Sequence, residues 1–470
     1  MLFYEPLFIT IFPAFYAVYL LAGGVSARKW LLLVASALFY FWGEPVFVLI
    51  LFVSTAFDYA LSFHLNEPTS PRTRQFALAA GVAGNLAMLV VYKYADFLAD
   101  NLNAALSPFG AHRLPLLHLA LPIGVSFVVF EKITYLVDTY RGISKPAATF
   151  RDYCLFVLFF PKLLAGPILK YHEMQDQIAR PRSVEWSDFG TGFLRFSRGI
   201  GRKLLIADPL GSFVNTVFAA DPASLSMSHA WLALGSFTLQ IYFDFAGYSD
   251  MAIGLARMLG FGLRENFNVP YASRSITEFW RRWHISLTTW IRDYLYKPLG
   301  GNRGGDARTY LNLWICFLLS GLWHGASWNF VLWGAYNGLF LTLDRVFLRD
   351  MLERCGAVIA TVVTLFIVMI GWAIFRSESP AHLTSFVSAL FGMASANDAL
   401  EIPGEVPFAL TLGAVISLLP ATALYPALVR RYEASPSLRA MTVAILGIVY
   451  VLAIARAVAA PFQPFIYFRF

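Results

Sequence analysis

Two histidines stand in stretches that are otherwise rich in apolar and aromatic residues, and each directly follows a tryptophan. His324 lies in "LSGLWHGASWNFVLWG" (residues 319–334), and His284 lies in "EFWRRWHISLTTW" (278–290). Burial disfavours a charged imidazole, so both rings are expected to be neutral near pH 7. A neutral imidazole can accept a hydroxyl proton, which predicts general-base chemistry. The alternative for either ring alone is a core residue bonded to a backbone carbonyl.

The residues around the two histidines suggest how a ligand would approach them. Trp283 and Trp323 precede the rings and are candidate donor contacts. Gly321 and Gly325 form a small-xxx-small pair beside His324, which allows another backbone or a thin ligand to come close. Plain helix packing explains the same pair equally well.

A third cluster, "YFDFAGYSDMAIG" (242–254), carries Asp244 and Asp250 in an apolar stretch. The two acids are not cofacial on a helix, so a shared metal is not expected. We expect them to orient a histidine or bind an arginine of the neighbouring polar segment. The three cysteines, Cys154, Cys316 and Cys355, also lack metal-ligand spacing, and we predict no metal site.

The elements that must position these residues are predicted to be membrane helices. Of 470 residues, 58% are hydrophobic and only 14% are charged, whereas soluble domains average about 25% charged residues. The mean hydropathy is +0.60. This composition predicts an all-α, polytopic transmembrane helical bundle of ten to thirteen spans, some of them broken, re-entrant or interfacial. The N-terminal run is expected to be a retained first span, because it lacks the features of a signal peptide.

The net charge of +7 is explained by cytoplasmic loops and lipid headgroups, so no nucleic-acid partner is expected. The sequence has no motif, in the required structural context, of a zinc hydrolase, a serine hydrolase, a P-loop ATPase or a dinucleotide-binding enzyme.

One segment, residues 262–309, is too polar to span a membrane and too aromatic for an ordinary loop. In it, Ser275 and Glu278 form a capping box that predicts a helix start. At the helical period, an apolar face then contains Trp280, Trp283, Leu287, Trp290, Ile291, Tyr294 and Leu295. A polar face contains Arg281, Arg282, Thr289, Arg292 and Asp293. We expect one amphipathic interfacial helix, with His284 on its apolar face, ended by "PLGGNRGG" (298–305).

The segment "SITEFWRRWHISLTTWIRDYLYKPLGGNRGG" followed by "LSGLWHGASWNFVLWGAYNG" resembles the signature of the membrane-bound O-acyltransferases. Within them it is most similar to the bacterial alginate O-acetyltransferase branch, in its membrane subunit. Further similar stretches are "LPIGVSFVVFEKITYLVDTYRG", "FPKLLAGPI", "GWAIFRSES" and the ending "PFIYFRF". The resemblance covers essentially the whole chain, 1–470, which we take as a single integral membrane domain with its signature region at about 242–340.

This resemblance implies an enzyme in which His324 is catalytic and His284 is the second active-site position. It implies a central tunnel, a cytoplasmic thioester donor (acetyl-coenzyme A as co-substrate, with no bound cofactor) and location in the bacterial inner membrane. It also implies periplasmic partners that pass the acetyl group to an extracellular polysaccharide such as alginate. From the chemistry, we expect His324 to act as base and His284 to position the donor or stabilise the oxyanion. Arg281, Arg282, Arg292 and Lys297 are candidate contacts for coenzyme phosphates, or for membrane lipids.

Two alternatives remain open. A teichoic acid D-alanyl transferase shares both histidine motifs but takes its thioester from a carrier protein. The chain length and the "FRSES" stretch (375–379) favour the alginate-like branch. A transporter of a lipid-linked saccharide would use His324 as a proton relay and would not consume a thioester.

Overall fold

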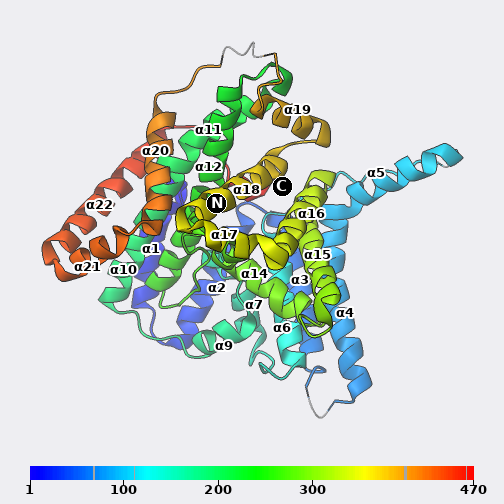
Figure 1. Cartoon of the computed structure of the whole chain (residues 1–470). Helices are drawn as coiled ribbons and strands as arrows, with labels where there is room; N and C mark the ends of the chain where they lie inside the picture. The colour runs from blue at the N-terminus through cyan, green and yellow to red at the C-terminus, as the bar shows by residue number, and fades with distance from the viewer. Residues whose placement is uncertain (67–68, 111, 396–399, 462, 470) are drawn as a thin grey trace. The chain divides into compact units, whose positions relative to one another are not determined.

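The computed structural model describes the chain except residues 67–68, 111, 396–399, 462 and 470 and the side chains of 468 and 469 (Figure 1). Helices account for 76% of the structure and no strand occurs in the described ranges, which confirms the all-α prediction. The chain forms two compact units. Unit 1 comprises Met1–Phe193 and Ala252–Arg264, and unit 2 comprises Leu194–Met251 and Glu265–Phe470. The single domain over 1–470 stays a prediction.

Unit 1 holds the N-terminal helices, which begin with prolines or capping residues in several cases. They are α1 (Pro6–Leu21), α2 (Val25–Phe41), α3 (Pro45–Ser62), α4 (Pro71–Leu89), η1 (Val90–Tyr94), α5 (Ala95–Leu106), η2 (Ser107–Phe109), α6 (Val125–Tyr140), α7 (Phe150–Leu158), α8 (Phe160–Leu163) and α9 (Tyr171–Ala179). The unit also includes the start of α10 (Trp186–Gly201) and the end of α12 (Met227–Met258).

The core of unit 1 contains charges that are paired. Helix α6 is buried along almost all of its length, including Glu131 and Lys132. Glu131 pairs with Lys162, and the Lys132 ammonium lies 3.2 Å from Asp58. Buried charges are tolerated when they are paired and hydrogen-bonded. The pairing of Glu131 and Lys132 therefore explains how the apolar run around 114–138 can carry charges and still be buried.

Unit 2 contains the signature histidines. Its helices are the rest of α10 and of α12, followed in chain order by η3 (Arg202–Ala207), α11 (Asp208–Ala219), η4 (Pro222–Ser224), η5 (Pro270–Ala272), α13 (Ile276–Arg282), α14 (Ile285–Ile291), η6 (Arg292–Tyr296), α15 (Gly305–His324), α16 (Trp328–Leu343), η7 (Asp344–Leu348), α17 (Arg349–Cys355), α18 (Ala357–Arg376), α19 (Pro380–Leu390), α20 (Glu405–Leu418), η8 (Leu419–Ala421), α21 (Tyr425–Ala434), α22 (Pro436–Ala459) and η9 (Ile466–Arg469).

Helices α15 and α16 lie side by side as an antiparallel hairpin whose short turn follows His324 (Figure 1). Their backbones approach closely at glycines. A Cβ on Gly321 would lie 2.1 Å from the carbonyl oxygen of Phe330, and one on Gly334 would lie 2.4 Å from that of Phe317. At Gly325 a Cβ would lie 2.1 Å from the Phe330 ring. Helix packing therefore explains the small-xxx-small pair, and the hairpin fixes the position of His324.

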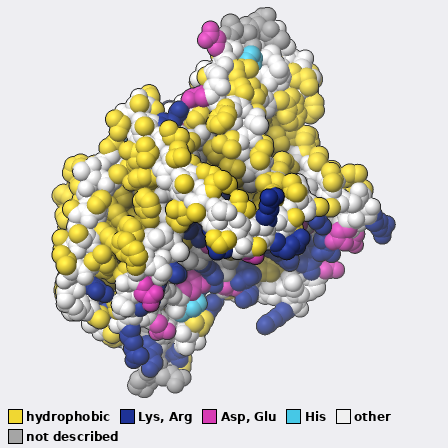
Figure 2. Space-filling model, turned by 90° about the vertical axis from the view of Figure 1, so that its left-hand side faces the viewer, with side chains coloured by type: hydrophobic (Ala, Val, Ile, Leu, Met, Phe, Trp, Pro, Cys, Tyr) yellow, Lys and Arg dark blue, Asp and Glu magenta, His cyan; other side chains and the backbone are white. Residues whose placement is uncertain are grey.

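By length and composition, four described helices can cross a membrane alone: Pro45–Ser62, Pro71–Phe109, Ala357–Arg376 and Pro436–Ala459. A fifth span exists if the pair Glu405–Ala421 and Tyr425–Ala434, bent by 90°, is counted as one broken span. These numbers are below the ten to thirteen spans expected, because several apolar runs form short or charged helices; α1, for example, has 16 residues. Many large hydrophobic side chains are exposed, and Figure 2 shows one face on which they predominate, as a lipid-facing surface requires.

Candidate active site

The prediction of one continuous amphipathic helix is wrong in one respect: the helix is interrupted at His284. Helix α13 ends at Arg282, α14 begins at Ile285, and His284 between them has φ +44° and ψ +54°. A histidine in this left-handed region is uncommon and costs about 1–3 kcal/mol. The local pattern of apolar residues continues across the break, so periodicity alone could not reveal it.

Residues 266–268, which precede α13, form hydrogen bonds with the chain on both sides of this break. Asn268 donates its backbone N–H to the carbonyl of Arg282 (2.9 Å), and Ile285 donates to the carbonyl of Asn266 (2.9 Å). The break is therefore fixed by tertiary hydrogen bonds, which removes His284 from a helical face and places it at the start of α14.

Other features of the segment follow the sequence prediction. Ser275 Oγ accepts a hydrogen bond from the backbone of Glu278 (3.1 Å), as the capping box requires. The Glu278 carboxylate reaches one residue further back than expected, to the backbone N–H of Arg274 (2.7 Å). The four residues of the predicted apolar face closest to His284 are buried: Trp280, Trp283, Leu287 and Trp290. The turn at 298–304 follows as expected.

His284 is only 1% exposed and is oriented by Asn266. Its Nδ1 lies 3.2 Å from Asn266 Oδ1, which also accepts hydrogen bonds from the backbone N–H (3.2 Å) and hydroxyl (2.9 Å) of Ser286. The Asn266 amide nitrogen in turn donates to Ser249 Oγ (3.2 Å). Because Oδ1 can only accept, the proton of the neutral imidazole lies on Nδ1 and the lone pair on Nε2.

Burial lowers the pKa of His284, which lies outside the candidate membrane spans, to about 3. The ring is thus neutral at physiological pH, as expected. Its one N–H is donated to Asn266, so a neutral His284 has no second N–H for an oxyanion. The geometry favours the positioning half of the predicted role over oxyanion stabilisation.

His324, the last residue of α15, is surrounded by aromatic rings and is 5% exposed. The rings of Trp333 and Phe375 pack edge-on against it, with centroids at 5.0 and 5.3 Å. Trp323 lies next to it and also 6.2 Å from the ring of His284. These contacts surround His324 with aromatic side chains, in line with the aromatic residues around it in the sequence.

Tyr467, near the end of the chain, brings the two histidines into one site. Its ring lies 5.6 Å from that of His324 and 6.5 Å from that of His284. Sequence reasoning quoted the ending "PFIYFRF" but assigned no role to it, and it missed Asn266 altogether. The available signals were the density of aromatic residues in that ending and the two asparagines of "NFN" (266–268), which lie just before the predicted helix. The final residue of the ending, Phe470, lies outside the described residues.

Asp244 holds this terminal segment in place. One carboxylate oxygen accepts a hydrogen bond from the backbone N–H of Ile466 (2.8 Å), and the other lies 3.0 Å from the Lys203 ammonium. Lys203 also contacts Asp208 at 2.7 Å. The expectation that Asp244 orients a histidine directly, or binds an arginine of the amphipathic segment, is wrong: its partners are the C-terminal backbone and a lysine of η3.

Asp250 does bind arginines, but not those expected. Its carboxylate lies 3.0 Å from Arg195, 2.9 Å from Arg198 and 2.6 Å from Arg202, all on α10 and η3. Burial of the Asp250 carboxylate costs desolvation free energy. The three guanidinium groups offset this cost because they are hydrogen-bonded to the carboxylate. Asp250 therefore stabilises the packing of α10 on α12 and does not reach either histidine through these contacts.

The basic side chains predicted to meet the donor lie at the surface of the α13–η6 region. Arg281 is exposed, whereas Arg282 pairs with Glu278 at 2.6 Å. Arg292 and Lys297 both pair with Asp293, at 3.1 and 2.7 Å. Exposed pairs of this type contribute little stability, so these cations can exchange their partners for phosphate at low cost.

Trp283 lies in the core and not along an open path. Its ring packs 4.9 Å from Trp372 and 5.5 Å from Phe279. This position supports the wall of the site, while its role as a donor contact stays a prediction. Within the described ranges, no group of three or more His, Cys, Asp or Glu side chains is arranged to hold a metal ion.

Comparison with known proteins identifies similar sequences. The model of the membrane-bound O-acyltransferase family matches residues 146–374. The probable alginate O-acetylase of Pseudomonas aeruginosa is 42% identical over 393 residues, which cover 83% of this chain and 75% of that protein. The peptidoglycan O-acetyltransferase of Helicobacter pylori is 35% identical, covering 79% and 74%. The teichoic acid D-alanyltransferase of Bacillus subtilis is 28% identical, covering 55% and 69%.

Proposed function

Because this chain belongs to the membrane-bound O-acyltransferase family and is a multi-pass membrane O-acyltransferase, we propose that it transfers acetyl groups from cytoplasmic acetyl-coenzyme A for O-acetylation of an extracellular polysaccharide such as alginate. In this proposal the enzyme lies in the bacterial inner membrane. It works with periplasmic proteins that carry the acetyl group to the polymer, and it needs no bound cofactor.

The observation that carries this proposal is the meeting of His284, His324 and Tyr467 in one buried aromatic site. Acyl transfer from a thioester needs a base for the acceptor hydroxyl and exclusion of water, which would otherwise hydrolyse the donor. A buried imidazole among Trp333, Phe375 and Tyr467 meets both requirements.

The proposed reaction proceeds by addition and elimination at the thioester carbonyl. His324 accepts the proton of the acceptor hydroxyl as its oxygen attacks the carbonyl carbon. The tetrahedral intermediate then collapses, the carbon–sulfur bond breaks, and the proton returns from the imidazolium to the departing thiolate. His284, fixed by Asn266, positions the reacting groups and needs no change of charge.

A D-alanyl transferase is the second candidate, since the similarity includes teichoic acid enzymes. The higher identity and greater coverage of the alginate enzyme favour acetyl transfer. Membership of an acyltransferase family favours either of these over a saccharide transporter, which would leave a thioester intact.

The test is thioester consumption by the purified protein in detergent. We expect release of free coenzyme A from acetyl-coenzyme A, detected by a thiol reagent, and none from the His324→Ala variant. Turnover of a D-alanyl carrier protein but not of acetyl-coenzyme A would favour the second candidate. Consumption of neither donor, in a protein that remains monodisperse, would contradict an acyltransferase of either specificity.

A further inference from the structure

Three turns that are rich in basic residues meet at one end of the helices of unit 1. They join α1 to α2, α3 to α4, and α6 to α7. Arg151, at the start of α7, donates to Ser26 Oγ in the first turn of α2 (2.8 Å). Arg74, near the start of α4, donates to the carbonyl of Tyr140 at the end of α6 (2.9 Å). These contacts bring the turns together where α2 and α7 lie side by side (Figure 1).

This end of unit 1 has an excess of positive charge. Residues 22–29 contain two cations and no acid, residues 63–74 two cations and one acid, and residues 141–152 three cations and one acid. In a membrane protein, the positive-inside rule assigns such an end to the cytoplasmic side, where the leaflet contains anionic lipids. The charge of this surface is therefore complementary to the headgroups beside it.

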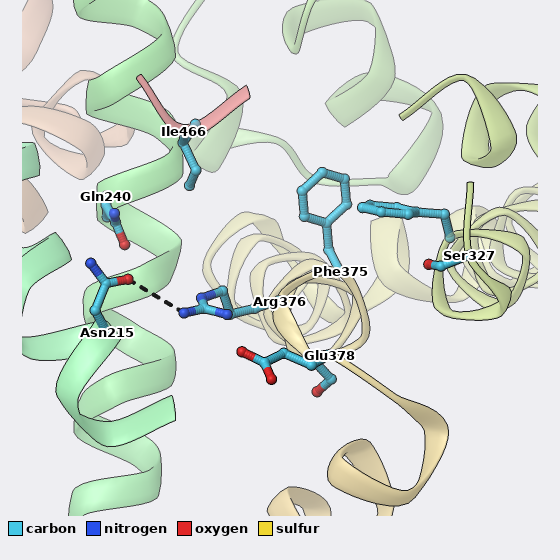
Figure 3. A pocket seen from close by; sticks show the side chains of 9 residues that line it. Asn215, Gln240, Ser327, Phe375, Arg376, Glu378 and Ile466 are labelled. Carbon is cyan, nitrogen blue, oxygen red and sulfur yellow. Dashed lines mark hydrogen bonds between the residues drawn. The ribbon is translucent and has the colours of Figure 1, made fainter. Parts of the chain in front are cut away.

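The cavity of about 340 Å³ in unit 2 provides a contrast, because its two charged lining residues have opposite signs (Figure 3). Arg376 extends towards α11 and donates to Asn215 Oδ1 (3.3 Å), while Glu378 supplies the negative charge. A lining with one cation and one anion is not complementary to an anionic headgroup. Of these two places, only the end of unit 1 has the charge that an anionic ligand requires.

Arg151 is the cation at this end that is placed to meet a ligand. Its Nε donates to Asp152 (3.3 Å) and its Nη1 to Ser26, which uses two of the five N–H groups of a guanidinium. Among the described residues, Nη2 has no hydrogen-bond partner, and the side chain is 19% exposed. Asp152 also pairs with Lys29 at 3.1 Å. Arg151 can therefore bind a phosphate through Nη2 while it keeps its contact with the carboxylate.

An apolar stripe on α2 begins at the same guanidinium. Arg151 lies over the ring of Trp30, 5.7 Å from its centroid. Trp30 is 53% exposed, and the exposed side chains of Val34, Leu38 and Phe41 follow it on one face of the helix. At the helical rise, the stripe extends about 16 Å from Trp30. A phosphate that carries acyl chains matches both features, whereas a free phosphate or a coenzyme leaves the stripe uncovered.

We propose that Ser26, Arg151 and the stripe that begins at Trp30 form a binding surface for an anionic phospholipid of the cytoplasmic leaflet. Arg151 Nη2 donates to the headgroup phosphate, the indole of Trp30 lies at the level of the headgroup, and an acyl chain follows the stripe. The binding requires neither a thioester nor an acceptor, so this inference is independent of the proposed acyl transfer.

The test is native mass spectrometry of the detergent-purified protein with dioleoyl phosphatidylglycerol or with dioleoyl phosphatidylethanolamine, which has the same chains and no net charge. We expect wild type to bind the first phosphatidylglycerol about fivefold more tightly, and Arg151→Gln to lose this preference. Asp152 keeps Lys29 as its partner in that variant, so no unpaired buried charge remains. Arg28→Gln is the matched control. It removes the same charge from the same helical turn, but Arg28 packs on Tyr19 (5.8 Å), on the opposite side of α2 from Trp30, and the preference should remain.

Trp30→Ala leaves the ion pairs intact and keeps the proposal testable if Arg151→Gln does not fold. It should weaken the binding of both phospholipids, because the stripe loses its largest side chain. Equal affinity of wild type for the two lipids, an unchanged preference in Arg151→Gln, or unchanged affinities in Trp30→Ala would each overturn the proposal. Coenzyme A is added as the other source of phosphate. One-for-one displacement of phosphatidylglycerol by coenzyme A would also overturn it and would assign the surface to the thioester donor.

Discussion

At the residue scale, the two histidines occupy different local environments and should respond differently to substitution. His324 ends a helix among aromatic rings, whereas His284 is held by a side-chain amide in a left-handed backbone conformation. In the proposed reaction, the imidazole of His324 acts as the base. The arrangement of His284 fixes its imidazole in one tautomer and orientation.

His324→Ala should abolish polysaccharide O-acetylation in cells while membrane expression stays close to wild type, because the base is lost and only one ring of the aromatic cluster is removed. General-base catalysis contributes about 10²–10⁴-fold, so residual acetylation should fall below one part in a hundred. His229→Ala, at the start of α12, is the control. Wild-type acetyl content in the His324→Ala polymer would disprove the assignment.

The lowered pKa of His284 predicts a pH-dependent stability. Its pKa is about 3 in the folded protein and 6.5 for the unperturbed group, so below about pH 6.5 the unfolded chain binds the additional proton. The free energy of unfolding therefore decreases as the pH falls, by about 2 kcal/mol at pH 5 from this group alone. Tm measured in detergent should fall from pH 7.5 to pH 5, and by less in His284→Asn. An equal fall in both proteins would exclude this contribution.

Asn266 should act as a positioning residue for His284. Asn266→Asp retains an acceptor for the Nδ1 proton, whereas Asn266→Leu removes it and leaves Ser286 without its partner. By analogy with groups that orient metal-bound histidines, we expect kcat to fall about 10–100-fold in Asn266→Leu. Asn266→Asp should recover part of this loss and shift the pH–rate profile. Equal loss in both variants, with equal Tm, would mean that the amide has no orienting role.

At the element scale, the sequence pattern predicts where the helix after Ser275 begins, whereas tertiary contacts determine where it is interrupted. The helix start at Ser275 and the buried tryptophans follow from capping and periodicity. The break at His284 could not be predicted, because it is imposed by backbone hydrogen bonds with Asn266 and Asn268, which precede the predicted helix. The partners of Asp244 and Asp250 were missed for the same reason: they lie far away along the chain.

The α15–α16 hairpin gives the next prediction. Gly321→Ala places a methyl group against the carbonyl oxygen of Phe330, a backbone atom that cannot yield. Overpacking costs about 1–3 kcal/mol, so Tm should fall and activity should be lost as His324 moves. Gly447→Ala, on α22 where nothing lies within 4 Å of the added Cβ, should keep or raise Tm. Both proteins can be compared by size-exclusion profile, Tm and turnover.

An unchanged Tm and turnover in Gly321→Ala would show that the two helices have space to separate. The same geometry determines what a Gly325→Leu variant would show. A leucine there would first displace the Phe330 ring, so loss of activity in that variant would report on packing and would not by itself locate a tunnel. The tunnel stays a prediction.

At the scale of the whole molecule, composition was sufficient for the membrane class and the all-α fold, because both follow from averages over the chain. The number of spans could not be predicted in this way. Hydropathy cannot distinguish a lipid-facing helix from an apolar helix that is covered by protein, such as α6. The sequence alone did not predict the orientation in the membrane, but the exposed charges of unit 2 allow a prediction. Exposed Arg and Lys gather at the α14–α15 turn and around α17, where Arg345 lies 4.0 Å from Asp306.

The positive-inside rule places this basic end in the cytoplasm and the α18–α19 end outside. Cys355 is exposed at the basic end, while Cys154 and Cys316 are buried. In right-side-out spheroplasts, a membrane-impermeant maleimide should therefore leave the wild-type protein unlabelled until the membrane is permeabilised. In a Cys355→Ser background, Thr384→Cys, exposed on α19, should be labelled at once. Labelling of Cys355 in intact spheroplasts would invert the orientation.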